Sequence, residues 1–174
     1  RNKIKKFDLI VIGGGSGGVR AARIASLHGA KVAICEKDKM GGTCVIRGCI
    51  PKKLLFYSSQ FQNIFSYSDS YGWSTSGIKY DFLKMIKNKN KEITRLEKIY
   101  EKNIITTGAS IFKGEASFIN KNKIKINNDI ISGDKIIIAS GGSPISLKVL
   151  GSHFADDSDT IMQLSKLPKT LTIV

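Results

Sequence analysis

A buried strand that runs directly into a glycine-rich turn and a helix is the feature that most constrains this fold. Residues 7–12 read FDLIVI, an almost wholly apolar run that is typical of a buried parallel strand. Residues 13–18 read GGGSGG, and the alanine-rich stretch at 19–27 predicts a helix that is capped at its C-terminus by Gly29. A second apolar run occupies residues 31–36. The order strand, helix, strand predicts an α/β, Rossmann-like domain with a parallel sheet.

The glycines of this turn have the spacing of a dinucleotide-binding loop. Gly13 permits the tight turn, Gly15 lets the backbone approach a pyrophosphate, and Gly18 lets the helix pack closely on the strand. The N-terminus of the helix would hold the phosphates, because its free N–H groups and its dipole attract anions. Glu36 ends the second strand, where an acid would accept hydrogen bonds from an adenosine ribose. A flexible glycine loop is the alternative, and the strands, helix and acid in register argue against it.

Two cysteines with four residues between them, Cys44 and Cys49, form the second marked feature. On a regular α-helix, Cα atoms five residues apart are separated by roughly 8.6 Å. A disulfide tolerates at most about 7 Å. We therefore expect a bend, with a helix that is irregular up to about Pro51 and regular from Lys52 onward, because Gly48 and Pro51 allow one. The pair could then open and close as a redox-active dithiol.

Two other interpretations of these cysteines are weaker. A zinc site usually needs four ligands, and the chain has three cysteines and two histidines without a second cluster, so we expect no metal site. The pair could also be inert buried thiols. The third cysteine, Cys35, lies within the second predicted strand and is expected to be a small buried core residue.

The net charge is +14, from 28 lysines and arginines against 14 acids, which raises the question of nucleic-acid binding. The lysines at 84–91 and 120–128 are mixed with asparagines and not with stacking aromatic residues. This is typical of a solvated surface, so we expect no nucleic-acid partner. We also expect no membrane span and no signal peptide. A dithiol without an export signal favours a reducing, cytoplasmic location.

The rest of the chain alternates between helical and strand-like periodicity. Residues 52–66 predict a core-facing helix, and residues 80–103 predict a long helix with its lysines on the outer face. Punctuated β-prone segments between 104 and 131 predict an antiparallel β-meander. Residues 135–140 predict a returning buried parallel strand. Towards the end, residues 158–167 predict a short helix and residues 171–174 the start of another buried strand.

Together these motifs resemble those of the FAD-dependent pyridine nucleotide-disulfide oxidoreductases. The stretch at 41–53, GGTCVIRGCIPKK, follows the β-α-β unit closely, and its double lysine is most similar to that of the glutathione reductases. The resemblance implies a first FAD-binding segment at 1–150 and a connection at 151–174 into an NADPH-binding domain. It further implies that this chain is the N-terminal portion of a longer enzyme that forms a homodimer, and that this portion alone is inactive.

The resemblance also assigns roles to individual residues. It implies that Cys44, Cys49 and Lys52 are catalytic, with Lys53 as the fallback for Lys52 as the cation near the flavin. It implies that Ser16, Arg23 and Tyr100 contact the substrate. The residues that would bind FAD are Gly13, Gly15, Ser16, Gly17, Gly18, Glu36, Gly42, Thr43, Cys44, Lys52, Ala116, Ser140 and Gly141.

The implied activity is reduction of oxidised glutathione by NADPH through FAD and the Cys44–Cys49 pair. Cys49 would face the flavin, and Cys44 would attack the substrate. Arg47 could favour an anionic substrate, and neither His28 nor His153 has a context suited to acid–base catalysis. Two alternatives stay open: a thioredoxin or trypanothione reductase of the same family, and a flavin-binding redox module without catalysis of its own.

Overall fold

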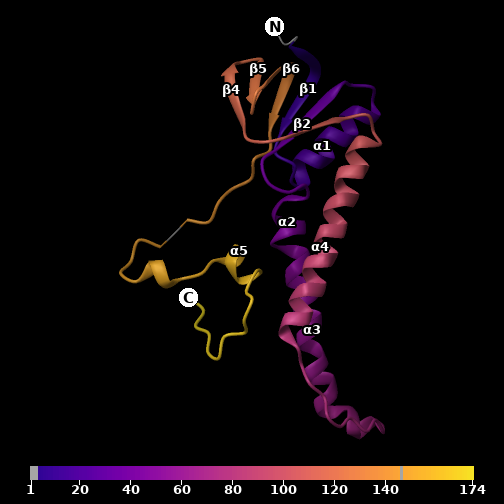
Figure 1. Ribbon diagram of the computed structural model, residues 1–174, viewed down its shortest axis with the longest axis vertical. Coiled ribbons are helices and arrows are strands. Elements are labelled where there is room, and N and C mark those ends of the chain that lie inside the picture. Colours follow the sequence, from indigo (N-terminus) through magenta and orange to yellow (C-terminus); the bar gives the residue numbers. More distant parts are fainter. Residues whose placement is uncertain (1–3, 146) are drawn as a thin grey trace.

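The computed structural model describes residues 4–145 and 147–174, and its centre is a six-stranded mixed sheet (Figure 1). The strand order is β3-β2-β1-β6-β5-β4. The first four strands in this order are parallel, and the last two continue the sheet in antiparallel fashion. This arrangement confirms the predicted α/β fold. The strands are β1 (Lys5–Ile12), β2 (Val32–Glu36), β3 (Ser110–Lys113), β4 (Ala116–Asn120), β5 (Lys123–Ile126) and β6 (Asp129–Ile138).

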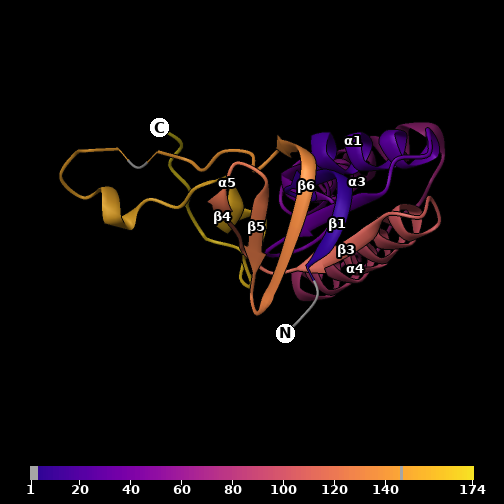
Figure 2. The ribbon, with the colours of Figure 1, turned by 90° about the horizontal axis from the view of Figure 1, so that it is seen from above.

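Strand β1 separates two halves of the core, because successive side chains of a strand point to opposite faces. Val11 is fully buried against one face, where α1 (Ser16–Leu27) and the end of α4 (Phe82–Ile105) cover it. Ile10 is fully buried on the other face, under the isoleucines of β5. Figure 2 shows β4 and β5 beyond β6, on the side away from these helices. Burial of each such side chain contributes about 1.5–3 kcal/mol.

Cys35 belongs to this second half of the core, as predicted. Only 1% of its surface is exposed, and burial raises the pKa of its thiol to about 12. It is therefore a neutral packing residue at physiological pH, separate from the other two cysteines.

The helices predicted at 19–27 and 80–103 are both confirmed. Their observed bounds, Ser16–Leu27 and Phe82–Ile105, lie close to the predicted ones. Gly29 follows α1 with φ +89°, and its N–H donates to the Ser26 carbonyl at 3.0 Å, so it closes the helix as expected. The long helix α4 begins two residues later than predicted, after Asp81, whose carboxylate accepts the Lys84 N–H at 2.9 Å.

The predicted meander at 104–131 is wrong in its first half. Helix α4 continues to Ile105, and β3 pairs in parallel with β2 instead of joining an antiparallel unit. Short, half-exposed strands look alike whichever direction their neighbour runs, so the periodicity could not distinguish the two cases. Only β4, β5 and β6 form the meander.

The expected separate strand at 135–140 is also corrected. Strand β6 is continuous from Asp129 to Ile138, and it pairs antiparallel with β5 and parallel with β1. Gly133 occupies a position of this strand that has no room for a side chain, because a Cβ there would lie 2.8 Å from Ile10 Cγ1. At its end Ile138 is 67% exposed, so this part of the strand is not buried.

Helix α3 (Cys49–Tyr67) is core-facing only in its first half. Figure 1 shows α3 and α4 extending together away from the sheet. Phe61 is consequently 55% exposed and Phe65 36%, although both have helical spacing. The chain then enters the short 3-10 helix η1 (Ser68–Tyr71).

The C-terminal residues contain less helix and strand than the sequence predicts. The helix predicted at 158–167 is limited to α5 (Ser158–Ile161), which follows the 3-10 turn η2 (Ser152–Phe154). Residues 171–174 form no strand with the described part of the chain, and Ile173 is 87% exposed. A buried strand needs partners on both sides, which four apolar residues alone do not specify. Among the described helices, none is long and apolar enough to cross a membrane.

One lysine of α4 contradicts the expectation that its lysines all face outward. Lys89 is only 2% exposed, and its ammonium donates to the Met162 carbonyl just after α5. Burial lowers the pKa of Lys89. This contact fastens the C-terminal segment to α4.

We predict that Lys89→Ala loosens residues 158–164 from α4. A hydrogen bond from a charged donor contributes about 1.5 kcal/mol or more, so amide hydrogen exchange of this segment should quicken about tenfold. Mass-spectrometric exchange on the full-length protein measures this. Lys87→Ala, at an exposed position of the same helix, is the control and should leave the exchange unchanged. Equal exchange in both variants would contradict the proposed fastening.

Candidate active site

The glycine turn after β1 has no room for side chains at two of its three motif positions. Gly13 has φ +109°, and a Cβ on it would lie 2.2 Å from the Ala139 carbonyl oxygen. A Cβ on Gly18 would lie 1.8 Å from the Gly13 carbonyl oxygen. The predicted roles of these two glycines in the turn and in helix packing are therefore visible in the backbone. Gly15 is the N-cap of α1 and contributes no side-chain cap, which leaves the first-turn N–H groups available to a phosphate.

Glu36 is held by two backbone donors at the end of β2. The Gly14 N–H donates to its Oε2 atom at 2.6 Å, and the Asp38 N–H donates to its Oε1 atom at 2.7 Å. Each carboxylate oxygen keeps a further lone pair for an additional donor. The carboxylate is thus oriented beside the glycine turn before any ligand binds.

A cavity of 150 Å³ opens between this carboxylate and the meander. It brings together four of the predicted cofactor residues, namely Gly13, Glu36, Ala116 and Ser140. Gly141, also predicted, directly follows Ser140 and has φ +73°. An oriented carboxylate, a helix N-terminus and a partly apolar wall suit the adenosine and phosphate groups of a dinucleotide.

The glycine turn also contacts the segment that carries the cysteines. A Cβ on Gly42 would lie 2.5 Å from the Cα atom of Gly15, and the Gly41 N–H donates to the Gly14 carbonyl at 2.8 Å. Gly41 and Gly42 both have positive φ, which few other residues tolerate. This contact places Gly42 and Thr43, the start of the short helix α2 (Gly42–Ile46), against the predicted phosphate loop.

The two cysteines lie on two different helices. Cys44 is in α2, Cys49 is the first residue of α3, and Arg47 and Gly48 between them are not helical. The predicted break is confirmed, but it ends earlier than expected, at Gly48. Helix α3 begins at Cys49, three residues before Lys52. Pro51 fits within the first turn of α3, where its missing N–H has no helical partner to lose. A Cβ on Gly48 would lie 2.8 Å from the Thr43 carbonyl oxygen, so this position too is crowded.

Both cysteines are free thiols in this structure, and they interact. Cys44 is half-buried and Cys49 is exposed. The hydrogen bond between the Cys44 thiol and the Cys49 side chain raises the pKa of Cys44, and burial adds to the increase. A hydrogen bond from the Cys49 backbone acts in the opposite direction. The two sulfurs are thus neighbours, as the dithiol interpretation requires.

The lysine pair lies at the start of α3, on the same face as Cys49. Lys52 and Lys53 follow Cys49 by three and four residues, a spacing that places side chains on one face of a helix. Both lysines are exposed. The Lys53 ammonium lies 5.7 Å from the centre of the Tyr57 ring, so the two lysines have different surroundings.

Arg47 does not have the free charge that we expected near a substrate. Its guanidinium donates to the Asp38 carboxylate, and its Nη1 atom lies 3.8 Å from an Asp159 carboxylate oxygen. Two acids therefore take up its charge. Sequence reasoning missed both partners, because neither acid lies at a spacing that marks it.

The predicted substrate residues lie on α1 and α4, which pack against each other. Ser16 is the exposed first residue of α1, next to Gly15. Arg23 lies two turns further on, and its Nε atom is buried without a hydrogen-bond partner among the described residues. Tyr100 of α4 is half-buried and packs against the core cluster beneath α1. Neither Arg23 nor Tyr100 lines the 150 Å³ cavity.

The histidines are placed as peripheral residues. His28 is the C-cap of α1, and the His153 ring packs on Phe154 with 3.9 Å between ring centres. Within residues 4–145 and 147–174, no group of three or more His, Cys, Asp or Glu side chains could hold a metal ion.

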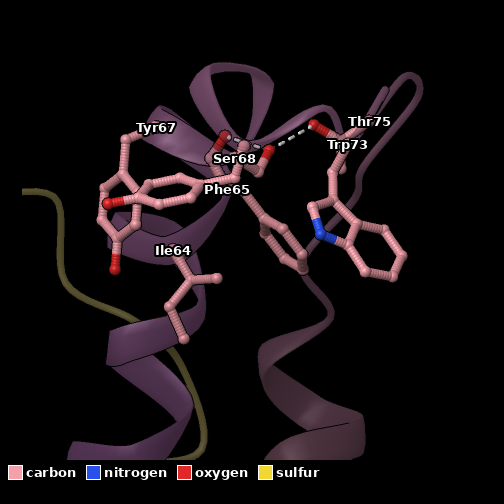
Figure 3. Close-up of a pocket in the computed structure, with 7 residues that line it drawn as sticks. Ile64, Phe65, Tyr67, Ser68, Trp73 and Thr75 are labelled. Atoms are coloured by element: carbon pink, nitrogen blue, oxygen red, sulfur yellow. Dashed lines mark hydrogen bonds between the residues drawn. The ribbon is translucent and has the colours of Figure 1, made fainter.

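A second cavity, of 440 Å³, lies at the far end of α3 and η1 (Figure 3). Its walls are mainly aromatic, and its Ser68 and Thr75 hydroxyls lie 3.3 Å apart and satisfy each other. Phe65, in its wall, is 16 residues along α3 from Cys49, roughly 24 Å away. This cavity is separate from the candidate active site.

Comparison with known proteins agrees with this geometry. The family model described as pyridine nucleotide-disulphide oxidoreductase matches residues 7–174. The chain is 44% identical over 168 residues to a glutathione reductase of Burkholderia cepacia, covering 97% of the chain and 37% of the relative. It is 38% identical over 179 residues to the chloroplastic/mitochondrial glutathione reductase of Pisum sativum, with 97% and 32% covered. The chain thus spans about a third of the length of these curated relatives.

A solved structure has a similar fold. The HOCl-induced flavoprotein disulfide reductase RclA from Escherichia coli, in a Cu(II) complex, superposes with a TM-score of 0.78 at 26% identity. The match covers 95% of this chain and 36% of that one.

We predict that Gly18→Ala strongly destabilises the full-length protein. The new methyl group would overlap the Gly13 carbonyl, and such overpacking costs at least about 2 kcal/mol. The matched control is Gly17→Ala, because a Cβ there meets no atom within 4 Å. This control should be neutral or stabilise the helix by up to about 1 kcal/mol. Chemical denaturation measures both, and equal stability of the two variants would refute the close packing.

The pH dependence of Cys44 alkylation gives a second prediction. Cys49 raises the pKa of Cys44, so less reactive thiolate is present near neutral pH. Cys49→Ala should therefore move the midpoint of the alkylation rate profile of Cys44 to lower pH and speed the reaction at pH 7. Cys35→Ala is the control and should leave the profile in place. A midpoint that stays or rises in Cys49→Ala would contradict the thiol contact.

Proposed function

This chain belongs to the pyridine nucleotide-disulphide oxidoreductase family, and on that premise we propose that the whole protein is an FAD-dependent, NADPH-dependent reductase of oxidised glutathione. The names of the relatives at 38–44% identity support the choice of glutathione as substrate. So does the Lys52–Lys53 pair, which is the feature most similar to the glutathione reductases.

The observation that carries this proposal is the juxtaposition of a dithiol and a dinucleotide loop. Gly42 packs directly on Gly15, and Cys44 follows Gly42 by two residues in the same short helix. A sulfur pair beside a phosphate-binding turn can exchange electrons with a bound redox nucleotide. A structural cysteine pair would have no need of this neighbour.

The residues that would hold FAD divide between its phosphates, its adenosine and its reactive ring. Gly13, Ser16, Gly17 and Gly18 would present the turn and the helix N-terminus to the pyrophosphate, and Glu36 would accept hydrogen bonds from the adenosine ribose. The Ala116 backbone, Ser140 and Gly141 would border the adenosine. Gly42, Thr43, Cys44 and Lys52 would line the path to the reactive ring, and Gly15 would let the backbone approach the pyrophosphate. When bound, the flavin supplies two-electron chemistry between a nicotinamide and a disulfide.

The two cysteines would divide the exchange reaction between them. The Cys44 thiolate attacks one sulfur of oxidised glutathione, which breaks the S–S bond, releases one glutathione thiolate and forms a mixed disulfide. The Cys49 thiolate then attacks the Cys44 sulfur, which releases the second glutathione and leaves a Cys44–Cys49 disulfide. Lys52 would stabilise negative charge on the reduced cofactor, with Lys53 as the fallback.

The remaining assignments follow the same proposal. Ser16, Arg23 and Tyr100 would contact glutathione. Residues 1–150 would form the first FAD-binding segment, and residues 151–174 would lead into the NADPH-binding domain of a homodimer. We also place the enzyme in a reducing cytoplasm, where a cysteine pair is more often catalytic than structural.

Two other functions are distinguishable from this one. A thioredoxin or trypanothione reductase would share the dithiol and the double lysine but prefer another disulfide. A non-catalytic flavin-binding redox module would keep the cofactor fold without turnover.

The test is NADPH oxidation by the full-length protein with oxidised glutathione, oxidised thioredoxin, trypanothione disulfide and lipoamide as parallel substrates. We expect a strong preference for glutathione. Turnover of another disulfide would identify one of the alternatives, and flavin reduction without turnover of any would support the redox module.

Cys49→Ser sharpens the same assay. This variant should still let NADPH bleach the flavin absorbance, while its disulfide reduction falls by more than about a hundredfold. Cys35→Ala is the matched control, since Cys35 is a buried core thiol, and it should keep its activity. Normal glutathione reduction by Cys49→Ser would refute the role of the pair.

A further inference from the structure

The break between α2 and α3 controls how close the two cysteines can come. Only Arg47 and Gly48 join the helices that carry Cys44 and Cys49, so their backbone angles determine the separation of the sulfurs. Arg47 has φ −144° and Gly48 has φ −136° with ψ −110°, both far from helical values. Whatever holds these two residues also influences the sulfurs.

The side chain of Arg47 fastens this break to two other parts of the molecule. It donates to Asp38, in the loop after β2, and lies 3.8 Å from Asp159 of α5. The Arg47 side chain is 30% exposed, Asp38 50% and Asp159 33%, so the cluster lies at the edge of the surface. A planar guanidinium can serve two carboxylates at once because its five N–H groups point in several directions.

This cluster continues to the nucleotide loop through hydrogen bonds. The Asp38 N–H donates to Glu36 at 2.7 Å, and the Gly14 N–H donates to the other oxygen of Glu36 at 2.6 Å. The break between the cysteines is thereby connected to the same carboxylate that faces the 150 Å³ cavity.

We propose that Arg47 is a positioning residue that holds the α2–α3 break so that Cys44 and Cys49 stay adjacent and can close to a disulfide. This proposal rests on the redox role of the pair proposed above. A dithiol tolerates a range of sulfur separations, whereas a disulfide requires an S–S distance near 2.05 Å and Cα atoms within about 7 Å. The Arg47 contacts are present while both cysteines are free thiols, so they keep the two sulfurs adjacent and lower the entropy that disulfide closure loses. Partly exposed ion pairs contribute little to global stability, so the effect is expected on this equilibrium and not on unfolding.

The test is the thiol–disulfide equilibrium of the pair in the full-length holoenzyme. The protein is equilibrated anaerobically with mixtures of reduced and oxidised glutathione, quenched with acid, alkylated and weighed by mass spectrometry. One oxidised glutathione takes two electrons and two protons from the dithiol and becomes two reduced glutathione molecules. We expect Arg47→Ala to lower the equilibrium constant for disulfide formation about threefold to tenfold. Tenfold corresponds to about 30 mV for this couple.

Further variants separate positioning from general stability. Arg47→Lys keeps the charge but lacks the planar fork, so its equilibrium constant should lie between those of the wild type and Arg47→Ala. Asp159→Asn breaks one contact only and should produce a smaller decrease. Arg95→Ala removes an exposed pair with Glu92 on α4 and should leave the equilibrium constant unchanged. Thermal unfolding of every variant is recorded beside it.

Each outcome decides a different statement. A lower equilibrium constant in Arg47→Ala and Asp159→Asn, with Arg95→Ala unchanged, supports the positioning role. If the wild type forms the disulfide and both variants form it with the same equilibrium constant, the positioning role is refuted and the proposed function stands. If the wild type forms no Cys44–Cys49 disulfide at any glutathione ratio, both are refuted.

Discussion

The structure depends on backbone segments that approach one another with no space for a side chain between them. Gly13 lies against Ala139 at the end of the sheet, Gly18 lies against Gly13 itself, and Gly42 lies against Gly15. The first two contacts join β6 and α1 to the turn, and the third joins the cysteine-bearing helix to it. Any Cβ at these points would push the parts away from each other. Because the same few glycines serve all three contacts, the sheet, the phosphate loop and the dithiol share one rigid centre.

Because these contacts depend on glycines at fixed spacings, more of the candidate site than of the rest of the fold could be predicted from the sequence. The glycine spacing and the apolar runs are local signals, and so is the spacing of Cys44 and Cys49, whose chain distance is incompatible with a bonded pair on an unbroken helix. Gly29 and Cys35 were equally predictable, because a helix stop and a cysteine within an apolar run depend only on neighbouring residues. In each case the physical requirement lies within one or two turns of chain.

The wrong predictions share a different cause, which is that they depend on what another segment does. Strand β3 pairs in parallel with β2, and nothing in its own four residues specifies this direction. Lys89 is buried and donates to the carbonyl of Met162, which lies 73 residues further along the chain. Phe61 is exposed because α3 extends past the sheet. The acids around Arg47 were missed for the same reason: Asp38 and Asp159 are 121 residues apart in the numbering and meet only in the folded chain.

The pairing of β1 with β6 also determines when this protein can begin to fold during synthesis. β1 ends at Ile12, but its neighbour on one side is complete only at Ile138. At about 5–20 residues per second, a ribosome needs roughly 6–25 s to produce the intervening chain. Throughout that time the edge of β1 that will pair with β6 has no native partner for its N–H and C=O groups and is open to unintended association. The central strand is thus translated early and completed late, and the nascent chain has to keep it soluble in between.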